Sequence, residues 1–473
     1  GGSIARYFIS LNGSNETSAY QQDKSSKYFK GLAYNTFGLR ANIDIDLTKT
    51  TKLYFGVNAN KTIRNLPGAA DTNLIWSACS KLTPVTIPVV YSNGMLPSAN
   101  GVTDEMSPYV LLNHTGLKQE EEFTSTYTLS LDQDLGMLIK GLKLNIQGAY
   151  TNDNAFHETR YIIPELWSYD KRNATGELAG KRQTERITTQ YSKWEMQYRK
   201  YFLQATMNWA HDLGHGHTLM ALAHYEMSDQ KRSTDANDTM SAIPVRYQGL
   251  SAKVGYNYND TYIVDGNFGY TGSETFAKGY RFGFFPAMGL AWYVSNEPFY
   301  PEVLKKVVNK LKFRFSIGRT GNDDTGGDRF LYRGTMKQDN GGYDRGFSDT
   351  GGMGGIGNGI TEARFEAPYL SWEIEEKKNY GIDLGLFDNR IDLQVDYFNN
   401  KRKSILLQRN TVSNVTGFQQ MPWQNFGIVK NHGVDASLTL NQKIGQVNLS
   451  ARGNFTFARN EIIEYDQVPQ VYP

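Results

Sequence analysis

Few side chains in this sequence have the types and spacing that a metal or catalytic site requires. His211, His215 and His217 lie together in the segment HDLGHGH, but no cysteine or ordered set of carboxylates accompanies them, as a zinc site would need. The segment Asn322–Asp328 carries amide and carboxylate oxygens, yet it lacks the spacing and the terminal glutamate of an EF-hand calcium loop. We therefore interpret both segments as polar connections and predict no bound metal.

Nucleotide binding and nucleophilic catalysis are also poorly supported. The segment GMGGIG at Gly352–Gly357 matches the glycine spacing of a nucleotide-binding loop, but that loop needs a strand before it and a helix after it. Neither element is indicated here, so we predict a flexible loop. Cys79 is the only cysteine, which excludes an internal disulfide, and it lies in a proline-rich segment away from any histidine. We predict that the chain is not an enzyme and uses no cofactor.

Aromatic side chains are the better candidates for ligand contact, because sugars bind to aromatic faces and loops concentrate variable binding residues. Four of them lie in segments that we predict to be loops: Trp76, Trp167, Tyr169 and Trp423. Aromatic residues also gather at the interface between a membrane and water. That second role is expected for a different set, Tyr7, Phe8, Tyr201, Phe202, Phe284, Phe285 and Tyr397.

The composition favours β-structure over a nucleic-acid-binding or helical membrane protein. The 473 residues carry a formal net charge of only +2, so bulk charge does not indicate binding to nucleic acid. Mean hydropathy is −0.52 and no run of about 18 apolar residues occurs, which excludes a transmembrane helix. Aromatic residues make up 13% of the chain and there are 46 glycines, a combination typical of strands joined by many turns.

Strict alternation of apolar with polar or small residues predicts about 15 strands. In residues 284–294, for example, Phe284, Met288 and Leu290 alternate with Ala287 and Gly289. The predicted strands are 3–12, 37–46, 53–59, 123–132, 142–150, 195–210, 218–228, 253–258, 262–270, 284–294, 312–319, 380–386, 391–397, 431–440 and 447–457. A polar loop is predicted to begin at Gly13. The long segments 62–122, 153–194, 229–249, 321–376 and 402–430 are also predicted loops, and a short helix is expected within 295–311.

Long and short connections alternate along the chain if 295–311 counts as short. Outer-membrane barrels have this pattern, with short periplasmic turns and long extracellular loops. We therefore predict an all-β fold, a large antiparallel transmembrane β-barrel formed by residues 1–473. Its apolar side chains would face lipid, and Asp392, Gln394, Asp396 and Arg452 would face the lumen. Because such barrels have even strand numbers and wide ones are plugged, an N-terminal plug and further C-terminal strands are expected outside this sequence. No secretory signal peptide is recognised at the start.

Several ordered segments resemble one known family. Asp265–Pro298, which contains GSETFAKGYRFGFFPAMGLAWYVSNEP, resembles the signature of SusC/RagA-type TonB-dependent outer-membrane transporters of Bacteroidetes. The segments LKFRFSIGRTGNDD at 311–324, YLSWEIEEKKNYGIDLGLFDNRIDLQVDYFNNKRKSILL at 369–407 and NFGIVKNHGVDASL at 425–438 follow in the family's order. The opening GGSIARYFISLNG is similar to the first barrel strand. The resemblance covers essentially the whole chain.

The resemblance implies a barrel of about 22 strands with an N-terminal plug, located in the bacterial outer membrane. It also implies two kinds of partner: a SusD-like surface lipoprotein over the extracellular loops, and TonB–ExbB–ExbD acting through an N-terminal region that this sequence lacks. The expected function is active import of nutrients, oligosaccharides first and peptides as the alternative. Outer-membrane lipid is the remaining expected contact, and no nucleic acid is expected.

Two other function classes stay open at the level of sequence. A soluble β-rich glycan-binding or adhesion module would also contain alternating strands. It would, however, leave apolar faces such as Leu393, Val395 and Tyr397 exposed to water on strand after strand. A passive porin would share the barrel and lack a plug. The sequence does not separate glycan from peptide as the substrate.

Overall fold

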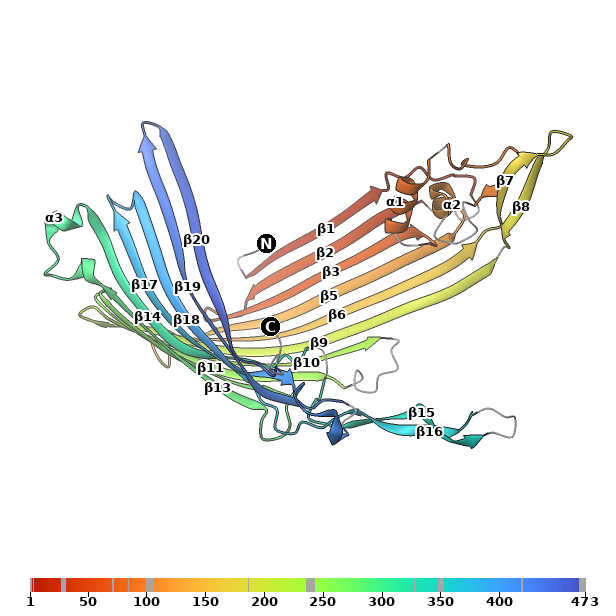
Figure 1. Ribbon diagram of the computed structural model, residues 1–473. Helices are drawn as coiled ribbons and strands as arrows, with labels where there is room; N and C mark the ends of the chain where they lie inside the picture. Colours follow the sequence, from red (N-terminus) through yellow and green to blue (C-terminus); the bar gives the residue numbers. More distant parts are fainter. Residues whose placement is uncertain are drawn as a thin grey trace. The chain divides into compact units, whose positions relative to one another are not determined.

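One large antiparallel β-sheet dominates the chain, as the computed structural model in Figure 1 shows. The structure describes residues 2, 4–26, 31–69, 72–83, 85–98, 106–185, 187–234, 243–326, 329–347, 353–417 and 420–467. The sheet has 15 strands in the order β1-β2-β3-β5-β6-β9-β10-β11-β12-β13-β14-β17-β18-β19-β20. Neighbours in the sheet are therefore neighbours along the chain, and the predicted fold class and strand number are confirmed.

The strands of this sheet are long. Their bounds are β1 (Ala5–Thr17), β2 (Ala33–Asp46), β3 (Thr51–Pro67), β5 (Gly116–Asp134), β6 (Leu142–Ile163), β9 (Ile187–Gly214), β10 (His217–Thr234), β11 (Val245–Tyr258), β12 (Tyr262–Ser273), β13 (Phe282–Tyr293), β14 (Val308–Asn322), β17 (Glu373–Leu386), β18 (Ile391–Gln408), β19 (Trp423–Ile444) and β20 (Val447–Glu464). Two small sheets accompany it: β4 (Leu96–Pro97) with β7 (Leu166–Arg172) and β8 (Leu178–Thr184), and β15 (Thr335–Phe347) with β16 (Met353–Arg364).

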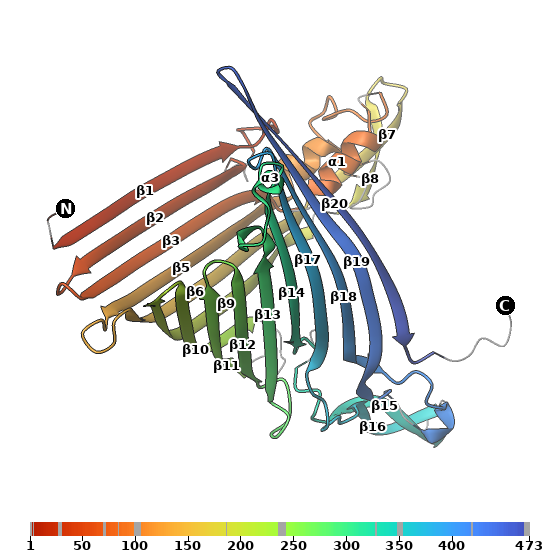
Figure 2. The same cartoon turned by 90° about the vertical axis from the view of Figure 1, so that its left-hand side faces the viewer.

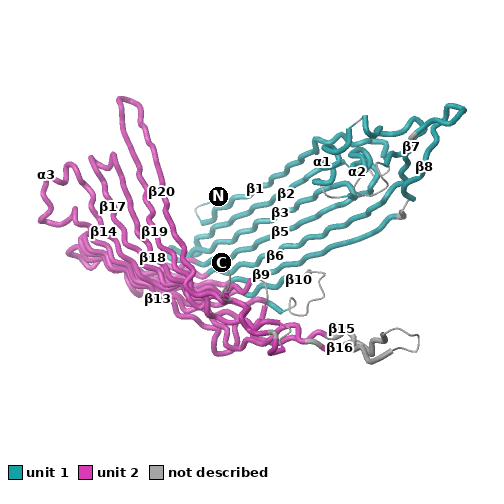
Figure 3. The backbone as a smooth tube through the Cα atoms, viewed as in Figure 1, with its two compact units in different colours: residues 1–131, 147–202, 229–244 teal, residues 132–146, 203–228, 245–473 magenta. Residues whose placement is uncertain are grey.

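The chain divides into two compact units, which Figure 3 colours separately. Unit 1 comprises Gly1–Leu131, Gln147–Phe202 and Asp229–Pro244, and unit 2 comprises Asp132–Ile146, Leu203–Ser228 and Val245–Pro473. Unit 1 contains the helices α1 (Thr72–Lys81) and α2 (Pro108–Asn113), and unit 2 contains α3 (Glu302–Lys305). The two units are described separately below.

Strands β12, β13, β14, β17 and β18 of unit 2 have one apolar face and one polar or small face. In the register of β13 with β14, Leu290 pairs with Phe315 and Trp292 with Phe313 on one face. On the other face Ala291 pairs with Arg314. This two-residue period follows from the pleat of a β-strand and confirms the predicted alternation. Val294, predicted to end this strand, lies instead in the short 3₁₀ helix η2 (Val294–Asn296) and is buried.

Short connections alternate with long ones around the sheet, except that the β13–β14 connection (residues 294–307) is longer than the β12–β13 connection (residues 274–281). The short ones include Asn259–Thr261 between β11 and β12 and Phe387–Arg390 between β17 and β18. Asn259 and Asp260 have φ values of 50° and 53°, a conformation that asparagine and aspartate tolerate in tight turns. Figure 2 shows α3 at one end of the strands of unit 2 and the hairpin β15–β16 at the other. The helix predicted within 295–311 is present as α3, and β14 already begins at Val308.

Several segments predicted as loops contain regular structure. The segment 62–122 holds α1 and α2 as well as the ends of β3 and β5, and 153–194 holds the hairpin β7–β8. The glycine-rich part of 321–376 pairs as β15 with β16, although Gly352 lies outside the described residues. The prediction of a flexible loop is therefore wrong for residues 353–357. These residues are part of strand β16, and no helix follows them before β17 in the described residues, so the strand–loop–helix arrangement of a nucleotide-binding loop is not formed there.

Most strands also extend beyond their predicted ends. The loop predicted to begin at Gly13 is part of β1, which pairs with β2 as far as Thr17 opposite Ala33. Side-chain hydrogen bonds accompany this polar extension, with Ser14 joined to Thr36 at 2.6 Å and Asn15 donating to Asn35. Ladder pairing continues wherever backbone groups can bond, whether or not the side chains alternate in polarity.

A hydrophobic core in unit 1 lies beside the sheet, where the long connections pack together. Its buried members come from α1, from α2 and Met106 just before it, and from the start of β7: Ile75, Ala78, Met106, Val110, Leu111, Leu112 and Leu166. Helix α2 begins at Pro108, and the Ser107 hydroxyl accepts a hydrogen bond from the Val110 N–H at 3.2 Å, which caps the helix. Within the described residues, no helix has the length and apolar character needed to cross a membrane.

Candidate ligand-contacting surface

Trp167 and Tyr169 lie two residues apart on β7, on the same side of the small sheet in unit 1. Their rings are stacked, with centroids 6.1 Å apart and an interplanar angle of 21°. The ring of Tyr169 lies directly over Gly180 of β8, its partner in the ladder. A Cβ at position 180 would lie 2.1 Å from the Tyr169 ring, so only glycine leaves room for this arrangement.

Two residues of the preceding connection complete this aromatic cluster. Tyr91 meets Tyr169 edge to face, with ring centroids 4.5 Å apart, a favoured aromatic geometry. The Asn93 side-chain amide donates a hydrogen bond of 2.7 Å to the Tyr169 hydroxyl. The indole N–H of Trp167 donates to Glu165 at 2.7 Å. We call Tyr91, Trp167 and Tyr169 the aromatic platform, because their rings are fixed by neighbours before any ligand arrives.

Trp76 is the most exposed of the four predicted contacts. It lies on α1 with 64% of its surface accessible, while Ile75 and Ala78 turn the other side of the helix into the core of unit 1. Its ring is 5.9 Å from that of Tyr20, which lies in the connection between β1 and β2. An exposed indole on a helix anchored by its buried face is well placed to meet a ligand.

The connection between β1 and β2 is fastened to α2 by a polar network. The Tyr109 hydroxyl donates to Asp23 at 2.8 Å, and the Asp23 N–H donates to the Asn113 side chain at 2.8 Å. Hydrogen bonds from Ser25 and Tyr109 lower the pKa of the Asp23 carboxyl. Burial lowers the pKa of His114, whose ring lies 5.3 Å from that of Tyr109. We call Asp23, Tyr109, Asn113 and His114 the α2 latch.

Trp423 lies in unit 2, at the start of β19, and belongs to a separate cluster. There it packs against buried residues of three connections, Phe276, Leu331, Ala367, Leu370 and Trp372. The Phe276 and Trp372 rings are 5.5 Å apart, and the Trp372 indole N–H donates to the Arg281 carbonyl at 3.0 Å. The structure thus brings Trp167 and Tyr169 together, and it places Trp76 elsewhere in unit 1 and Trp423 in unit 2.

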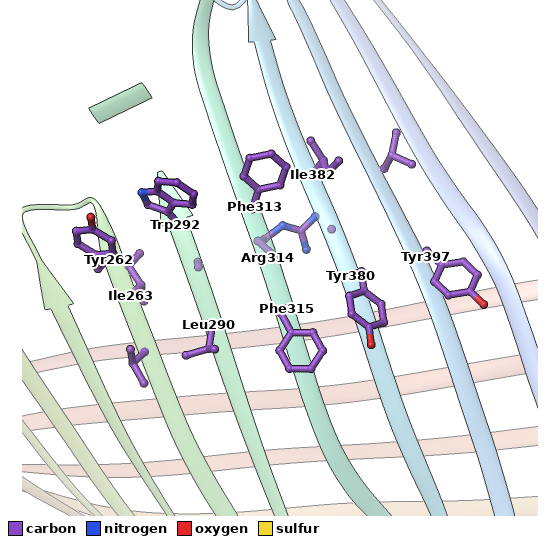
Figure 4. Close-up of a pocket in the computed structure, with 14 residues that line it drawn as sticks. Tyr262, Ile263, Leu290, Trp292, Phe313, Arg314, Phe315, Tyr380, Ile382 and Tyr397 are labelled. Carbon is purple, nitrogen blue, oxygen red and sulfur yellow. The ribbon is translucent and has the colours of Figure 1, made fainter. Parts of the chain in front are cut away.

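The polar face of unit 2 carries a compact ionic cluster. Arg314 of β14 donates to Asp383 of β17 at 2.7 Å and to Asp396 of β18 at 2.9 Å. Asn379 donates to Asp396 as well, at 2.7 Å. The predicted polar orientation of Asp396 is therefore confirmed. The opposite face forms an apolar hollow of aromatic and aliphatic side chains, shown in Figure 4, in which Trp292, Phe313 and Tyr380 are prominent.

The remaining polar motifs have ordinary structural roles. His215 lies in the β9–β10 turn with a φ of 53°, His217 is hydrogen-bonded to the Tyr256 hydroxyl at 2.7 Å, and His211 stacks on Trp209. In the segment Asn322–Asp328, whose last two residues lie outside the described part, Asp324 caps the turn by accepting from the Gly326 N–H at 2.9 Å. Among the residues that the structure describes, no group of three or more potential metal ligands occurs.

Comparison with known proteins accounts for this architecture. The family model described as "TonB dependent receptor-like, beta-barrel" matches residues 80–471, more than four-fifths of the chain. The chain belongs to this family. The resemblance predicted from the signature Asp265–Pro298 is thereby confirmed, and its alternating strands are those of a TonB-dependent receptor-like barrel.

Relatives of this TonB-dependent receptor-like chain point the same way. TonB-dependent receptor P3 of Formosa agariphila is 22% identical over 97% of this chain and 46% of its own length. TonB-dependent receptor SusC of Bacteroides thetaiotaomicron is 27% identical over 44% of this chain and 20% of its own length. A structure of the RagAB peptide importer in its "open-open" state superposes with a TM-score of 0.68 at 17% identity, over 100% of this chain and 51% of that one. The chain spans about half the length of these relatives or less.

In this TonB-dependent receptor-like chain, sequence reasoning missed Tyr91 of the aromatic platform and two residues that contact Tyr169, namely Asn93 and Gly180. Tyr91 approaches Tyr169 because β4 pairs in parallel with β7, Leu96 opposite Leu166, across a sequence separation that no local pattern reveals. The tripeptide Ser-Asn-Gly after Tyr91 did signal a turn, and Gly94 has a φ of 82° there. Gly180 carries no sequence signal, because its importance depends on the ring that lies above it.

Proposed function

We propose that this chain forms the membrane-spanning barrel of a TonB-dependent importer in the bacterial outer membrane. The proposal rests on the separation of apolar from polar side chains onto opposite faces of the unit 2 sheet, together with membership of the family. Lipid would contact the face that bears Leu290, Trp292 and Phe313, since each of these side chains is exposed and apolar. The face with Arg314, Asp383 and Asp396 would line the lumen, because the polar residues of a membrane barrel face its interior.

The proposed substrate is an oligosaccharide. The support is the aromatic platform, because flat rings held in place lose little conformational freedom when a sugar ring stacks on them. Asn93 and Glu165 are engaged with the platform, and their remaining hydrogen-bonding capacity is available to hydroxyl groups of a sugar. Trp76 and Trp423 remain proposed contacts on the same argument. A peptide substrate is the alternative, and it would be an outcome of the uptake experiment below.

The proposed partners are a SusD-like lipoprotein and the TonB–ExbB–ExbD complex. The similarity to SusC and the match to the RagAB structure support pairing with a lipoprotein over the long connections. In unit 1 these connections carry α1, α2 and the hairpin β7–β8, which together provide a folded surface for such a partner (Figure 1). TonB would supply the energy for transport, as the family's description, TonB-dependent, indicates.

Uptake by cells that carry the full-length gene tests the proposal. We expect labelled oligosaccharides to enter in a way that stops when the proton-motive force is dissipated, and the intact protein to change its gel migration on boiling. The double variant Trp167→Ala/Tyr169→Ala should lower the affinity for the oligosaccharide by about tenfold, equivalent to about 1.4 kcal/mol. Tyr7→Ala, which removes an exposed aromatic ring from β1, should not change it.

Each other outcome has a distinct meaning. Uptake that survives dissipation of the proton-motive force would indicate a passive porin. Recovery of the protein without detergent and with unchanged migration after boiling would indicate a soluble module. Uptake of peptides in place of oligosaccharides would keep the transporter and overturn the proposed substrate.

A further inference from the structure

Two connections at the same end of the unit 2 strands, β5–β6 and β13–β14, expose apolar side chains where a connection is ordinarily polar. In the β5–β6 connection, Met137, Leu138 and Ile139 are 83%, 73% and 54% exposed. In the β13–β14 connection, Val303 and Leu304 of α3 are 79% and 44% exposed, and no residue of that helix is buried. Single exposed apolar residues are ordinary, but adjacent ones at the tips of two turns form patches that need an apolar partner.

Both patches end in lysine. Lys140 follows Met137–Ile139 directly, and Lys305 and Lys306 follow Leu304. We call residues 137–140 the first tip and residues 302–306 the second tip. The first tip has a net charge of +1, and so has the second, because Glu302 offsets one of its two lysines. Among the residues that the structure describes, none of the three lysines takes part in an ion pair.

Hydrogen bonds hold the first tip in place. It forms a helical turn in which the Leu138 and Ile139 N–H groups donate to the Leu135 carbonyl at 2.8 and 3.1 Å. Trp209 of the neighbouring strand β9 then donates its indole N–H to the Lys140 carbonyl at 3.1 Å. These hydrogen bonds fix the backbone of the first tip, and they hold the apolar side chains of Met137, Leu138 and Ile139 in their exposed positions.

The second tip is fixed by its surroundings as well. Tyr300 is buried, and its hydroxyl donates to the Val308 carbonyl at 3.0 Å. Trp292 and Tyr262 both donate to Glu297, and the Phe387 N–H of the next turn donates to the Val307 carbonyl at 2.9 Å. Trp292 and Tyr262 also line the apolar hollow of Figure 4, so the tip continues the apolar face of the sheet.

We propose that the two tips dip into the phospholipid leaflet on the short-turn side of the barrel and bind anionic phospholipid. The proposal rests on the membrane-spanning function proposed above. Apolar side chains followed by lysine suit this interface, because the lysine stem lies along the acyl region while its ammonium reaches the phosphate layer. The positive charge of each tip selects an anionic headgroup over a zwitterionic one.

Native mass spectrometry of the full-length transporter, purified in detergent and given equal amounts of phosphatidylglycerol and phosphatidylcholine, tests this proposal. We expect the wild type to retain phosphatidylglycerol preferentially. Lys140→Ala and Lys306→Ala should each reduce that preference by about fivefold. Lys278→Ala is the matched control, because Lys278 is an exposed lysine in the β12–β13 connection, at the opposite end of the strands, and it should leave the preference unchanged.

A second pair of measurements separates the apolar contribution from the ionic one. Leu138→Asn/Val303→Asn should lower retention of both lipids. Added inorganic phosphate should not displace phosphatidylglycerol, since the acyl chains contribute to binding. The proposal is overturned if the wild type shows no preference, if the lysine variants keep it, or if phosphate alone displaces the lipid. Boiling-dependent migration is measured on the same samples, and oligosaccharide uptake is measured in cells that carry the same variants. A failure confined to lipid binding therefore leaves the proposed transport function standing.

Discussion

Arg314 donates two hydrogen bonds to Asp383, from Nε at 3.0 Å and from Nη2 at 2.7 Å. The same Nη2 also reaches Asp396 at 2.9 Å. Gly381 lies beneath the guanidinium, and a Cβ there would come within 2.7 Å of Arg314 Cζ. One arginine thus joins three adjacent strands of unit 2, and a missing side chain on the middle strand makes the space for it.

Removing the Arg314 side chain should destabilise the sheet. Asp383 and Asp396 have side-chain exposures of only 12% and 19%, so the variant Arg314→Ala would leave two poorly hydrated carboxylates without their cation. We expect a loss of about 1–3 kcal/mol in the free energy of unfolding, less than for a fully buried pair. Guanidinium unfolding of the full-length protein in detergent measures it.

Arg319 on the same strand provides the control. Its side chain is 53% exposed, and its partner Glu376 also pairs with Lys403, so Arg319→Ala should change the free energy of unfolding by less than about 0.5 kcal/mol. Equal losses for the two variants would show that the cluster around Arg314 has no special role.

Gly180→Ala should disturb the aromatic platform through Tyr169 alone. The new methyl group would overlap the Tyr169 ring, so the ring must move, and we expect the affinity for oligosaccharide to fall about fivefold. Titration of the full-length protein with the oligosaccharide gives the affinity. In a Tyr169→Ala background the same change should have no further effect. Gly453→Ala, at a position with no atom within 4 Å of the new Cβ, serves as the control.

Acidification should loosen the α2 latch through His114. We call the latch closed when its hydrogen bonds are formed and open when they are broken and His114 is exposed to water. Burial lowers the pKa of His114 below its ordinary value of 6.5 in the closed form, so the open form binds more protons than the closed form. Above pH 6.5 the stability of the closed form relative to the open form is therefore at its full value. This stability decreases as the pH falls from 6.5 to the lowered pKa of His114, and it stays constant below that pKa. Asp23, whose pKa is lowered from 3.8, does not titrate in this window.

Hydrogen exchange of residues 18–26 and 108–114 measures this effect in the full-length protein. Protection, corrected for intrinsic rates, should be lower at about pH 5.5 than at about pH 7.5. His114→Gln should make protection equal at the two values. A wild-type latch with the same protection at both would contradict the expectation.

Phe276→Ala should open the cluster of connections in unit 2. Phe276 is 2% exposed and packs on Trp372, so its truncation creates a cavity and should destabilise this region by about 3–5 kcal/mol. Limited proteolysis of the full-length protein, with cleavage mapped to residues 274–281 and 366–372, detects the change. Phe299→Ala removes the same side chain from a site that is 66% exposed, and it should leave cleavage at these segments as in the wild type.

The sheet was predictable from sequence where its two faces meet different surroundings. Leu290 and Trp292 alternate with Gly289 and Ala291 because one face is apolar and the other polar or small, and period two follows. Where both faces of a strand are exposed to water, the alternation of apolar and polar residues disappears from the sequence, although the backbone pairing between strands continues. Ser14 and Asn15 of β1 show this, since they read as loop and yet pair with β2.

The candidate site was predictable only in part. The prediction relied on the aromatic type of the residues, and the sequence did not indicate which of them lie close together in space. Trp167 and Tyr169 were identified as aromatic residues of a long connection, and their adjacency on one strand follows from spacing of two. Tyr91 and Gly180 required the registers of β4 and β8 against β7, which connect distant parts of the chain. Helix α1 was missed because prolines surround a segment of only ten residues.

The polar extension of β1 against β2 has a mechanical consequence. Residues Gly13–Thr17 add five paired positions to β1, which at about 3.3 Å each lengthen the hairpin by about 16 Å. Amide and hydroxyl pairs such as Asn15 with Asn35 stiffen this part, so it forms a rigid extension of the strands and not a flexible connection. In the proposed membrane barrel, the distance between the α2 latch and the apolar zone of unit 1 would therefore be set by the length of these strands and would stay the same when the bilayer thickness changes.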